Sequence, residues 1–137
     1  MTARRCAVIG GGIAGASVAA SLARRGWQVQ VLDAAAHPAA GASGLPVGLF
    51  APHVSPDDAI LSQLTRAGVQ ATLQQASALL QRGDDWDDSG VLEHGVKGAR
   101  RLPNVDTGSR CATLQERAAA GLDADAPALW HTHAGWL

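Results

Sequence analysis

The sequence predicts an α/β fold that begins with a parallel β-α-β unit, and three features of its first part support this prediction. An apolar run, "CAVI" (6–9), precedes a turn of three consecutive glycines. Small and apolar residues with helical spacing follow at 15–25, and "WQVQVLD" (27–33) then alternates like a strand. Together the three segments have the length of a right-handed crossover between neighbouring parallel strands.

Each segment of this unit has its own signal. The first strand lacks polar alternation, which is typical of a parallel strand covered by helices on both faces. In the helix, Val18 and Leu22 lie one turn apart, and Gly26 is placed to end it. The second strand carries two valines, and it ends on Asp33.

A long loop and a long helix are expected next. Residues 37–52, "HPAAGASGLPVGLFAP", are rich in Ala, Gly, Ser and Pro, which predicts an extended loop longer than an ordinary connection. The segment 55–83 predicts a helix, with Gly68 as a point where it would bend or break. We expect Ser55 as its N-cap and Gly83 as its end.

The predicted helix has a polar first turn and one apolar face. Pro56 would take the first helical position, and two acidic residues would lie in the first turn, where the helix dipole favours anions. Apolar residues at helical spacing then mark one face. The acidic pair is Asp57 and Asp58, and the face consists of Ile60, Leu64, Ala67 and Ala71.

The last third of the chain predicts short elements only. We expect one or two strands within 91–102, a short helix within 113–122 and a strand over 128–137. The domain organisation that follows is a nucleotide-binding part at 1–56 and a helix with part of a second domain at 57–137.

Composition limits the possible partners and settings. The 137 residues have 47% hydrophobic content and a net charge of −1 from 11 basic and 12 acidic side chains. This balance gives no electrostatic signal for nucleic acid or an anionic membrane. Cys6 and Cys111 have no disulfide or metal-ligand spacing, and no apolar run is long enough for a signal peptide or a membrane span. We therefore expect a reduced, cytoplasmic setting and no membrane contact.

The glycine turn is the motif that predicts chemistry. Residues 10–15, "GGGIAG", fit G-x-G-x-x-G between a strand and a helix, the fingerprint of a Rossmann-like dinucleotide site. Gly10 allows the tight turn, Gly12 lets the backbone approach a pyrophosphate, and Gly15 lets the helix lie close to the strand. With Ile13 and Ala14, they place a helix N-terminus at the phosphates.

Asp33 narrows the choice of nucleotide. It lies 23 residues after Gly10, near the spacing at which an acidic side chain accepts hydrogen bonds from a ribose. A carboxylate there repels a 2′-phosphate, so FAD or NAD is favoured over NADP. The alternative is a glycine turn that binds nothing.

Further motifs resemble one family. The stretches "VIGGGIAGAS", "AAGASGLPVGLFAPHVSPDD", "GDDWDDSGVLE" and "PALWHTHAGWL" are similar to FAD-dependent D-amino-acid-oxidase-like oxidoreductases, which include glycine oxidase. Within that family they look most like members that modify the wobble uridine of tRNA. The chain departs from the family at Leu45-Pro46, where Asn-Pro is common. The side-chain amide that the family has at this point is therefore missing here.

The resemblance implies FAD as cofactor and assigns further residues to it. One group would lie along the pyrophosphate and ribityl chain, and a second group near the isoalloxazine ring. The first group is Ala42, Ser43 and Gly44, and the second is Pro46, Val47, Gly48 and Leu49.

The implied activity is oxidation of a carbon–nitrogen bond in a secondary amine, with the flavin taking the hydride. The implied substrate is the carboxymethylaminomethyl group on uridine in tRNA. Two alternatives stay open, a glycine- or sarcosine-type oxidase and a non-catalytic FAD-binding module. Because the family's FAD domain is discontinuous, we expect the chain to match only the N-terminal part of such an enzyme. No residue is identifiable as a catalytic acid or base, and the oligomeric state is not predicted.

Weaker candidates have structural interpretations that we favour. A metal site is the less favoured interpretation for four clustered carboxylates and for two alternating histidines. One loop histidine could steer a substrate, an arginine pair could meet an anion, and the four tryptophans are expected to pack. These residues are Asp84, Asp85, Asp87 and Asp88; His131 and His133; His53; Arg100 and Arg101; and Trp27, Trp86, Trp130 and Trp136.

Overall fold

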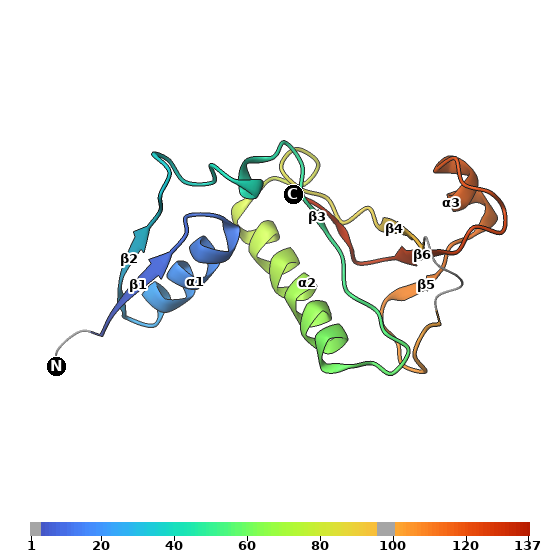
Figure 1. Ribbon diagram of the computed structural model, residues 1–137, viewed down its shortest axis with the longest axis horizontal. Coiled ribbons are helices and arrows are strands. Elements are labelled where there is room, and N and C mark those ends of the chain that lie inside the picture. Colours follow the sequence, from blue (N-terminus) through green and yellow to red (C-terminus); the bar gives the residue numbers. More distant parts are fainter. Residues whose placement is uncertain (1–3, 96–100) are drawn as a thin grey trace. The chain divides into compact units, whose positions relative to one another are not determined.

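The chain forms two compact units, one ending at Gly48 and the other beginning at Leu49. The computed structural model describes residues 4–95 and 101–137 (Figure 1). Each unit has its own strands and helices and is described by itself. The functional division at residue 56 stays a prediction.

The first unit is the predicted β-α-β arrangement. Its strands β1 (Arg5–Ile9) and β2 (Gln28–Leu32) are parallel and joined by helix α1 (Ile13–Arg24). Helix α1 begins two residues earlier than predicted, so Gly15 lies in its first turn. After β2 the chain runs through a loop that contains a short 3₁₀ helix, η1 (Ala42–Gly44). The α/β fold with a Rossmann-like start is confirmed.

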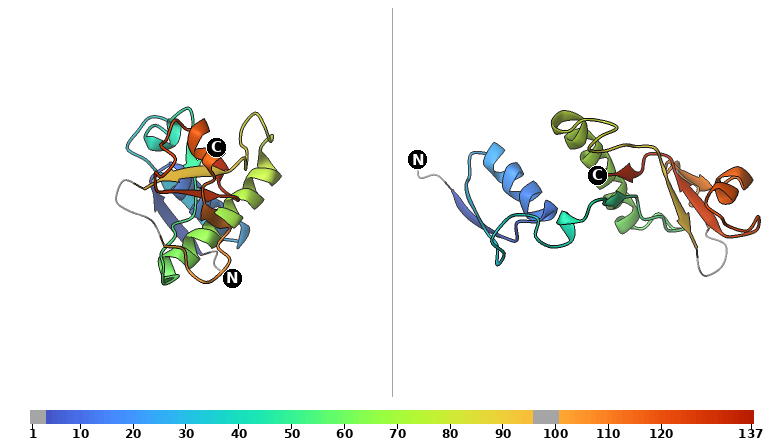
Figure 2. Two further views of the ribbon diagram at one scale, coloured as in Figure 1. Left: turned by 90° about the vertical axis from the view of Figure 1, so that its right-hand side faces the viewer. Right: turned by 90° about the horizontal axis from the view of Figure 1, so that it is seen from above.

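The first unit buries little apolar surface. Among its described residues only Val8 is buried, and its side chain faces α1. In the right view of Figure 2, α1 lies over one side of the two strands. Ile9 points to the other side and is 88% exposed. Within the first unit α1 covers one face of the strands, and helices on both faces stay a prediction.

The second unit is built on a three-stranded antiparallel sheet with β6 in the centre. Strands β4 and β5 flank β6, and a separate two-stranded sheet pairs β3 with β7. Two helices, α2 and α3, complete the unit. The bounds are β3 (Leu49–Phe50), α2 (Ile60–Leu79), β4 (Val91–His94), β5 (Ser109–Cys111), α3 (Leu114–Ala119), β6 (Ala128–His131) and β7 (Gly135–Trp136).

Helix α2 is confirmed, but its predicted start and end are wrong. It begins at Ile60, so Pro56, Asp57 and Asp58 precede it, and it ends four residues before Gly83. The backbone of Asp58 has φ +50°, which a right-handed helix does not allow. The N-cap is Ala59, without a side-chain hydrogen bond.

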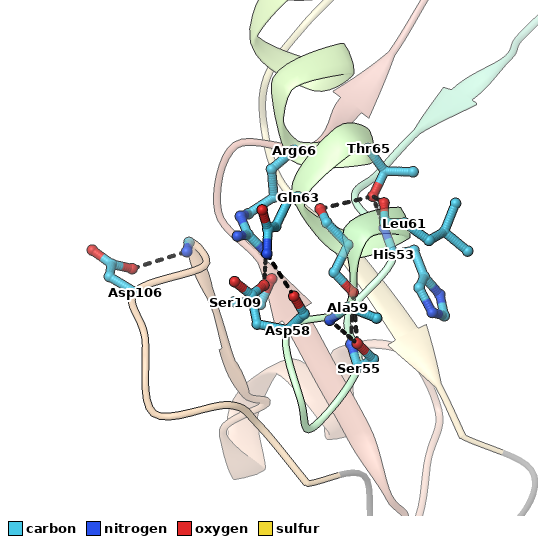
Figure 3. Close-up of polar contacts among 12 residues, drawn as sticks. His53, Ser55, Asp58, Ala59, Leu61, Gln63, Thr65, Arg66, Asp106 and Ser109 are labelled. Carbon is cyan, nitrogen blue, oxygen red and sulfur yellow. Dashed lines mark hydrogen bonds and ion pairs between the residues drawn. The ribbon is translucent and has the colours of Figure 1, made fainter.

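Ser55 stabilises the turn before α2 and is not its cap. Its hydroxyl accepts a hydrogen bond from the Ala59 amide at 3.0 Å and lies 2.9 Å from the buried Ser62 hydroxyl (Figure 3). The Ser55 carbonyl accepts from the Asp58 amide at 3.1 Å. The Ser-Pro-Asp-Asp sequence therefore forms a turn of its own, which a helix-start pattern does not distinguish from a first helical turn.

The buried face of α2 is not the apolar one. Its buried residues are Ser62, Val69 and Ala76, at seven-residue spacing. The predicted apolar face is exposed, with Ile60 at 74% and Leu64 at 64%. Val69 and Ala76 pack in the core, and Ser62 is buried beside them because its hydroxyl bonds to Ser55 in the loop before the helix. Gly68 does not break α2, which runs through it without interruption.

The last part of the chain forms the predicted short elements with one correction. Within 91–102 the structure shows one strand, β4, while residues 96–100 lie outside the described residues. Helix α3 forms as expected, with Thr113 and Glu116 in a capping box. The segment 128–137 is two strands separated by a turn, not one. Over the described residues, no helix is long and apolar enough to cross a membrane.

Candidate cofactor site at the glycine turn

The glycine turn connects β1 to α1 through close backbone contacts. Gly10 has φ +103°, which favours glycine, and its amide donates to the Leu32 carbonyl at 2.7 Å. A β-carbon on Gly15 would overlap the Gly10 carbonyl oxygen and lie 3.5 Å from Val8 Cγ1. Any side chain at Gly15 would therefore push α1 away from β1, as the fingerprint predicts.

The N-terminus of α1 is open to an anion except for one hydroxyl. Gly12 is the N-cap and supplies no side chain, so the first-turn amides have no partner inside the helix. The Ile13 amide donates to Ser43 Oγ at 2.9 Å. A β-carbon on Gly12 would lie 2.9 Å from the same oxygen. The predicted residues Gly12, Ile13 and Ser43 thus meet at one point, beside Ala14 and Gly15.

Asp33 lies at the same turn. Its Oδ2 accepts from the Gly11 amide at 2.5 Å, and its Oδ1 accepts from the Ala35 amide at 2.8 Å. The Ala35 and Gly11 amides lower the pKa of the Asp33 carboxyl below its usual value. The carboxylate is therefore ionised at neutral pH, and each oxygen keeps acceptor capacity for a further donor such as a ribose hydroxyl.

The loop after β2 folds back onto the glycine turn through residues that the sequence analysis missed. The Ala39 amide donates to the Gly11 carbonyl at 3.1 Å, and Ala39 has φ +59°. A β-carbon on Gly44 would overlap the Ala39 carbonyl oxygen. Gly44 is thus required by the fold of the loop itself. An alanine with positive φ gives no signal in a single sequence.

The residues expected near the isoalloxazine ring are exposed. Val47 is 55% exposed and Leu49, the first residue of β3, is 73% exposed. Pro46 and Gly48 are exposed as well, and so is Ala42, which is expected along the pyrophosphate and ribityl chain. Because Gly48 and Leu49 lie at the division between the two units, their role beside a flavin stays a prediction.

Comparison with known proteins decides the family. A family model described as "FAD dependent oxidoreductase" matches residues 5–137. The chain belongs to the FAD-dependent oxidoreductase family. FAD is the cofactor of this family, so FAD is the dinucleotide that the fingerprint indicates.

Several curated relatives of this chain share the name "tRNA 5-methylaminomethyl-2-thiouridine biosynthesis bifunctional protein MnmC". The protein of Delftia acidovorans is 58% identical over 100% of this chain and 23% of its own length. The protein of Polaromonas naphthalenivorans is 57% identical over 97% of this chain and 23% of its own length. The protein of Pseudomonas putida is 39% identical over 98% of this chain and 22% of its own length. The chain thus spans less than a quarter of the length of these relatives.

The geometry of the first unit fits the phosphates of FAD. The α1 N-terminus offers unpaired amides and partial positive charge, and Ser43 adds a hydroxyl beside them. Because residue 12 is glycine, the space beside Ser43 Oγ stays open, whereas a side chain there would occupy it. These features lie within one unit, so they do not depend on how the two units are arranged.

The acidic loop after α2 uses its carboxylates internally. Asp85 accepts from the Gln81 amide at 2.9 Å, and Asp84 accepts from the Gln81 side chain at 2.5 Å. Asp87 and Asp88 form ion pairs with Arg82. The four carboxylates are therefore held by hydrogen bonds and ion pairs within the loop itself.

The two alternating histidines have different environments. His131 in β6 is buried, with Nδ1 2.8 Å from Ser109 Oγ and Nε2 3.1 Å from Glu93 Oε2. His133 lies in the turn after β6 and is exposed. In the described ranges 4–95 and 101–137, no group of three or more His, Cys, Asp or Glu side chains is arranged to hold a metal ion.

The remaining candidates have structural contacts. The His53 amide donates to Thr65 Oγ1 at 3.0 Å, which ties the loop to α2 (Figure 3). Arg101 is exposed, and Arg100 lies outside the described residues. Three tryptophans face arginine side chains, and one of them, Trp86, is buried in the core. These pairs are Trp27 with Arg4, Trp86 with Arg82, and Trp130 with Arg110, while Trp136 lies in β7.

Proposed function

We propose that this chain binds FAD at the glycine turn and contributes the nucleotide-binding part of an oxidoreductase that acts on a secondary amine. The observation that carries the proposal is the meeting of Gly12, Ile13 and Ser43 at the N-terminus of α1. Bound FAD supplies hydride acceptance from the carbon beside the amine nitrogen. The chain's own residues hold and orient the cofactor.

Each residue of the proposed site has one role. The amides of the first α1 turn donate to the pyrophosphate, and Ser43 Oγ donates a further hydrogen bond there. The Asp33 carboxylate accepts from the adenosine ribose. Two further groups of residues are proposed to contact the rest of FAD. Ala42 and Gly44 would lie along the pyrophosphate and ribityl chain. Those near the isoalloxazine ring would be Pro46, Val47, Gly48 and Leu49.

The proposed substrate is the carboxymethylaminomethyl group of uridine in tRNA, which loses its carboxymethyl arm. The names of the relatives support it, since they place those proteins in biosynthesis of a methylaminomethyl-thiouridine of tRNA. We propose the cytoplasm as the site of action for the same reason. The alternatives are a glycine- or sarcosine-type amine and a module that binds FAD without catalysis.

Titration of the purified chain with FAD, followed by the visible spectrum after gel filtration, tests the cofactor. We expect FAD to stay with the chain, and Ser43→Ala to weaken its retention because one phosphate donor is lost. Ser89→Ala is the matched control, since Ser89 is an exposed serine of the second unit. Loss of FAD from the unchanged chain would contradict the proposal.

Hydrogen peroxide release tests the substrate once FAD is bound. Hypomodified tRNA with the carboxymethylaminomethyl group should support release, while glycine and sarcosine should not. Release with the free amines alone would favour the amino-acid alternative. An FAD-loaded chain that is inactive with all three would favour the binding module.

A further inference from the structure

The second unit contains a cavity that is separate from the glycine turn. It has a volume of about 200 Å³ and lies between α2, the loop before β5 and the turn after β6. This is below the roughly 300–1,000 Å³ typical of sites for drug-sized ligands, so it suits one small ring. We call it the Asp106 cavity, and its lining residues are Pro52, Arg66, Val69, Gln70, Asp106, Thr107, Gly108 and His133.

The cationic side chain of the cavity is already compensated. Arg66 Nη1 donates to Asp58 Oδ1 at 2.6 Å, and this hydrogen bond raises the pKa of the guanidinium (Figure 3). A free phosphate or carboxylate would therefore compete with Asp58 for Arg66. The remaining guanidinium N–H groups suit a neutral acceptor such as a carbonyl oxygen.

The anionic side chain of the cavity keeps a free acceptor. Asp106 Oδ1 accepts from the Gly108 amide at 2.9 Å, which fixes the carboxylate. Within the described ranges, its other oxygen has no hydrogen-bond donor. An ionised carboxylate is acceptor-only, so the ligand must bring an N–H or O–H group to this point.

The other polar side chains of the cavity are also unused. In the described part of the chain, Gln70 and His133 form no side-chain hydrogen bond. The His133 ring lies against Gly108, because a β-carbon there would be 2.9 Å from its Cδ2. An exposed aromatic ring held in this way offers a face for stacking, while Val69 and Pro52 form an apolar floor.

We propose that the Asp106 cavity binds one unpaired nucleobase of the cytosine type, with an amino group beside ring acceptors. The exocyclic amino group donates to Asp106, the carbonyl accepts from Arg66 or Gln70, and the ring stacks on His133. This combination is how proteins read splayed bases of single-stranded RNA. The inference rests on the proposed function, since it gives a tRNA substrate a contact on this chain.

Titration of the isotope-labelled full chain with cytidine and with uridine, followed by amide chemical shifts, tests the proposal. Cytidine has an exocyclic amino group at the position where uridine has a carbonyl, so only cytidine offers the exocyclic donor that Asp106 is proposed to accept from. We expect shifts at Gln70, Thr107 and Gly108 and an affinity for cytidine about tenfold higher. Equal affinities, or shifts elsewhere in the chain, would overturn it.

Asp106→Asn is the decisive variant because it exchanges one acceptor for a donor of the same shape. The amide oxygen can still accept from the Gly108 amide, and its NH₂ group now faces the ligand. The preference should therefore reverse toward uridine. Asp125→Asn, an exposed carboxylate outside the cavity, is the matched control and should keep the preference for cytidine. An unchanged preference in Asp106→Asn would contradict base recognition.

Two further readouts separate this inference from the proposed function. If millimolar glycine displaces cytidine and shifts the same amide signals, the cavity binds an amino-acid zwitterion. That result would overturn base recognition. Retention of FAD without a preference for cytidine would overturn base recognition alone. A preference for cytidine in a chain that does not retain FAD would support base recognition and contradict the proposed function.

Discussion

The two units of the chain obtain their structure in different ways. The first buries only Val8 among its described residues, whereas the second holds a core that includes Val69, Trp86 and Leu129. Yet the glycine turn of the first unit is closed by backbone contacts among residues 10–15 and 39–44. Local backbone geometry therefore defines the candidate cofactor site, while side-chain packing defines the second unit.

The sharpest difference should appear on removal of a large side chain. Leu129→Ala empties a fully enclosed position in the central strand β6, where Leu129 is 2% exposed. We expect the free energy of unfolding to fall by about 2–5 kcal/mol. Denaturant unfolding followed by tryptophan fluorescence measures it. Leu32→Ala in β2, where the leucine is 47% exposed, should cost less than about 1 kcal/mol. Equal losses would contradict the comparison.

The next effect concerns binding rather than stability. Gly15→Ala forces α1 away from Gly10, so its first-turn amides no longer meet the phosphates. Charge-assisted hydrogen bonds are worth about 1.5–3 kcal/mol each, so the Kd for FAD should rise by about tenfold or more. Isothermal titration measures this change. Gly41→Ala is the control, because a β-carbon there meets no described atom within 4 Å. An unaltered Kd in Gly15→Ala would disprove the role of close packing.

Acid should loosen α3 while leaving β6 intact. The Arg110 guanidinium and the Thr113 amide lower the pKa of Glu116 to about 2 from 4.5. This depressed pKa stabilises the folded state above pH 4.5, and the contribution is lost as the pH falls toward 2. Chemical shifts of the α3 amides should follow that titration. In Glu116→Gln they should not, and the same titration there would refute this assignment.

The smallest expected effect is a gain in stability. Gly68 lies inside α2 with open space around it, so Gly68→Ala should raise the free energy of unfolding by about 0.5–1 kcal/mol. Gly121→Ala should destabilise instead, because Gly121 has φ +69°. Thermal unfolding of both variants checks the two signs. A loss of stability in Gly68→Ala would mean that a β-carbon at position 68 meets a neighbouring group, which contradicts the open space around Gly68.

The sequence predicts best where a local pattern has one structural solution. The strand, the three glycines and Asp33 predict a β-α-β turn, and the structure has this turn with Ser43 beside Gly12. The capping residues of α3 likewise specify its start. In both cases the spacing of residues along the chain is enough to predict the local structure.

Long-range contacts account for what the sequence could not predict. Ser55-Pro56 has the pattern of a helix start, but hydrogen bonds to Ser62 hold it in a turn. The face of α2 with Ile60 and Leu64 is exposed, while the face that carries Ser62, Val69 and Ala76 is buried. The buried His131 depends on Ser109 and Glu93, which come from neighbouring strands far apart in the sequence.

Amide hydrogen exchange with and without FAD tests the central claim most directly, because it reports on both units at once. We expect added protection at the amides of 11–15 and 43–44, with no change in the strands β4, β5 and β6. Protection confined to the second unit, or no protection at the glycine turn in a chain that retains FAD, would contradict it.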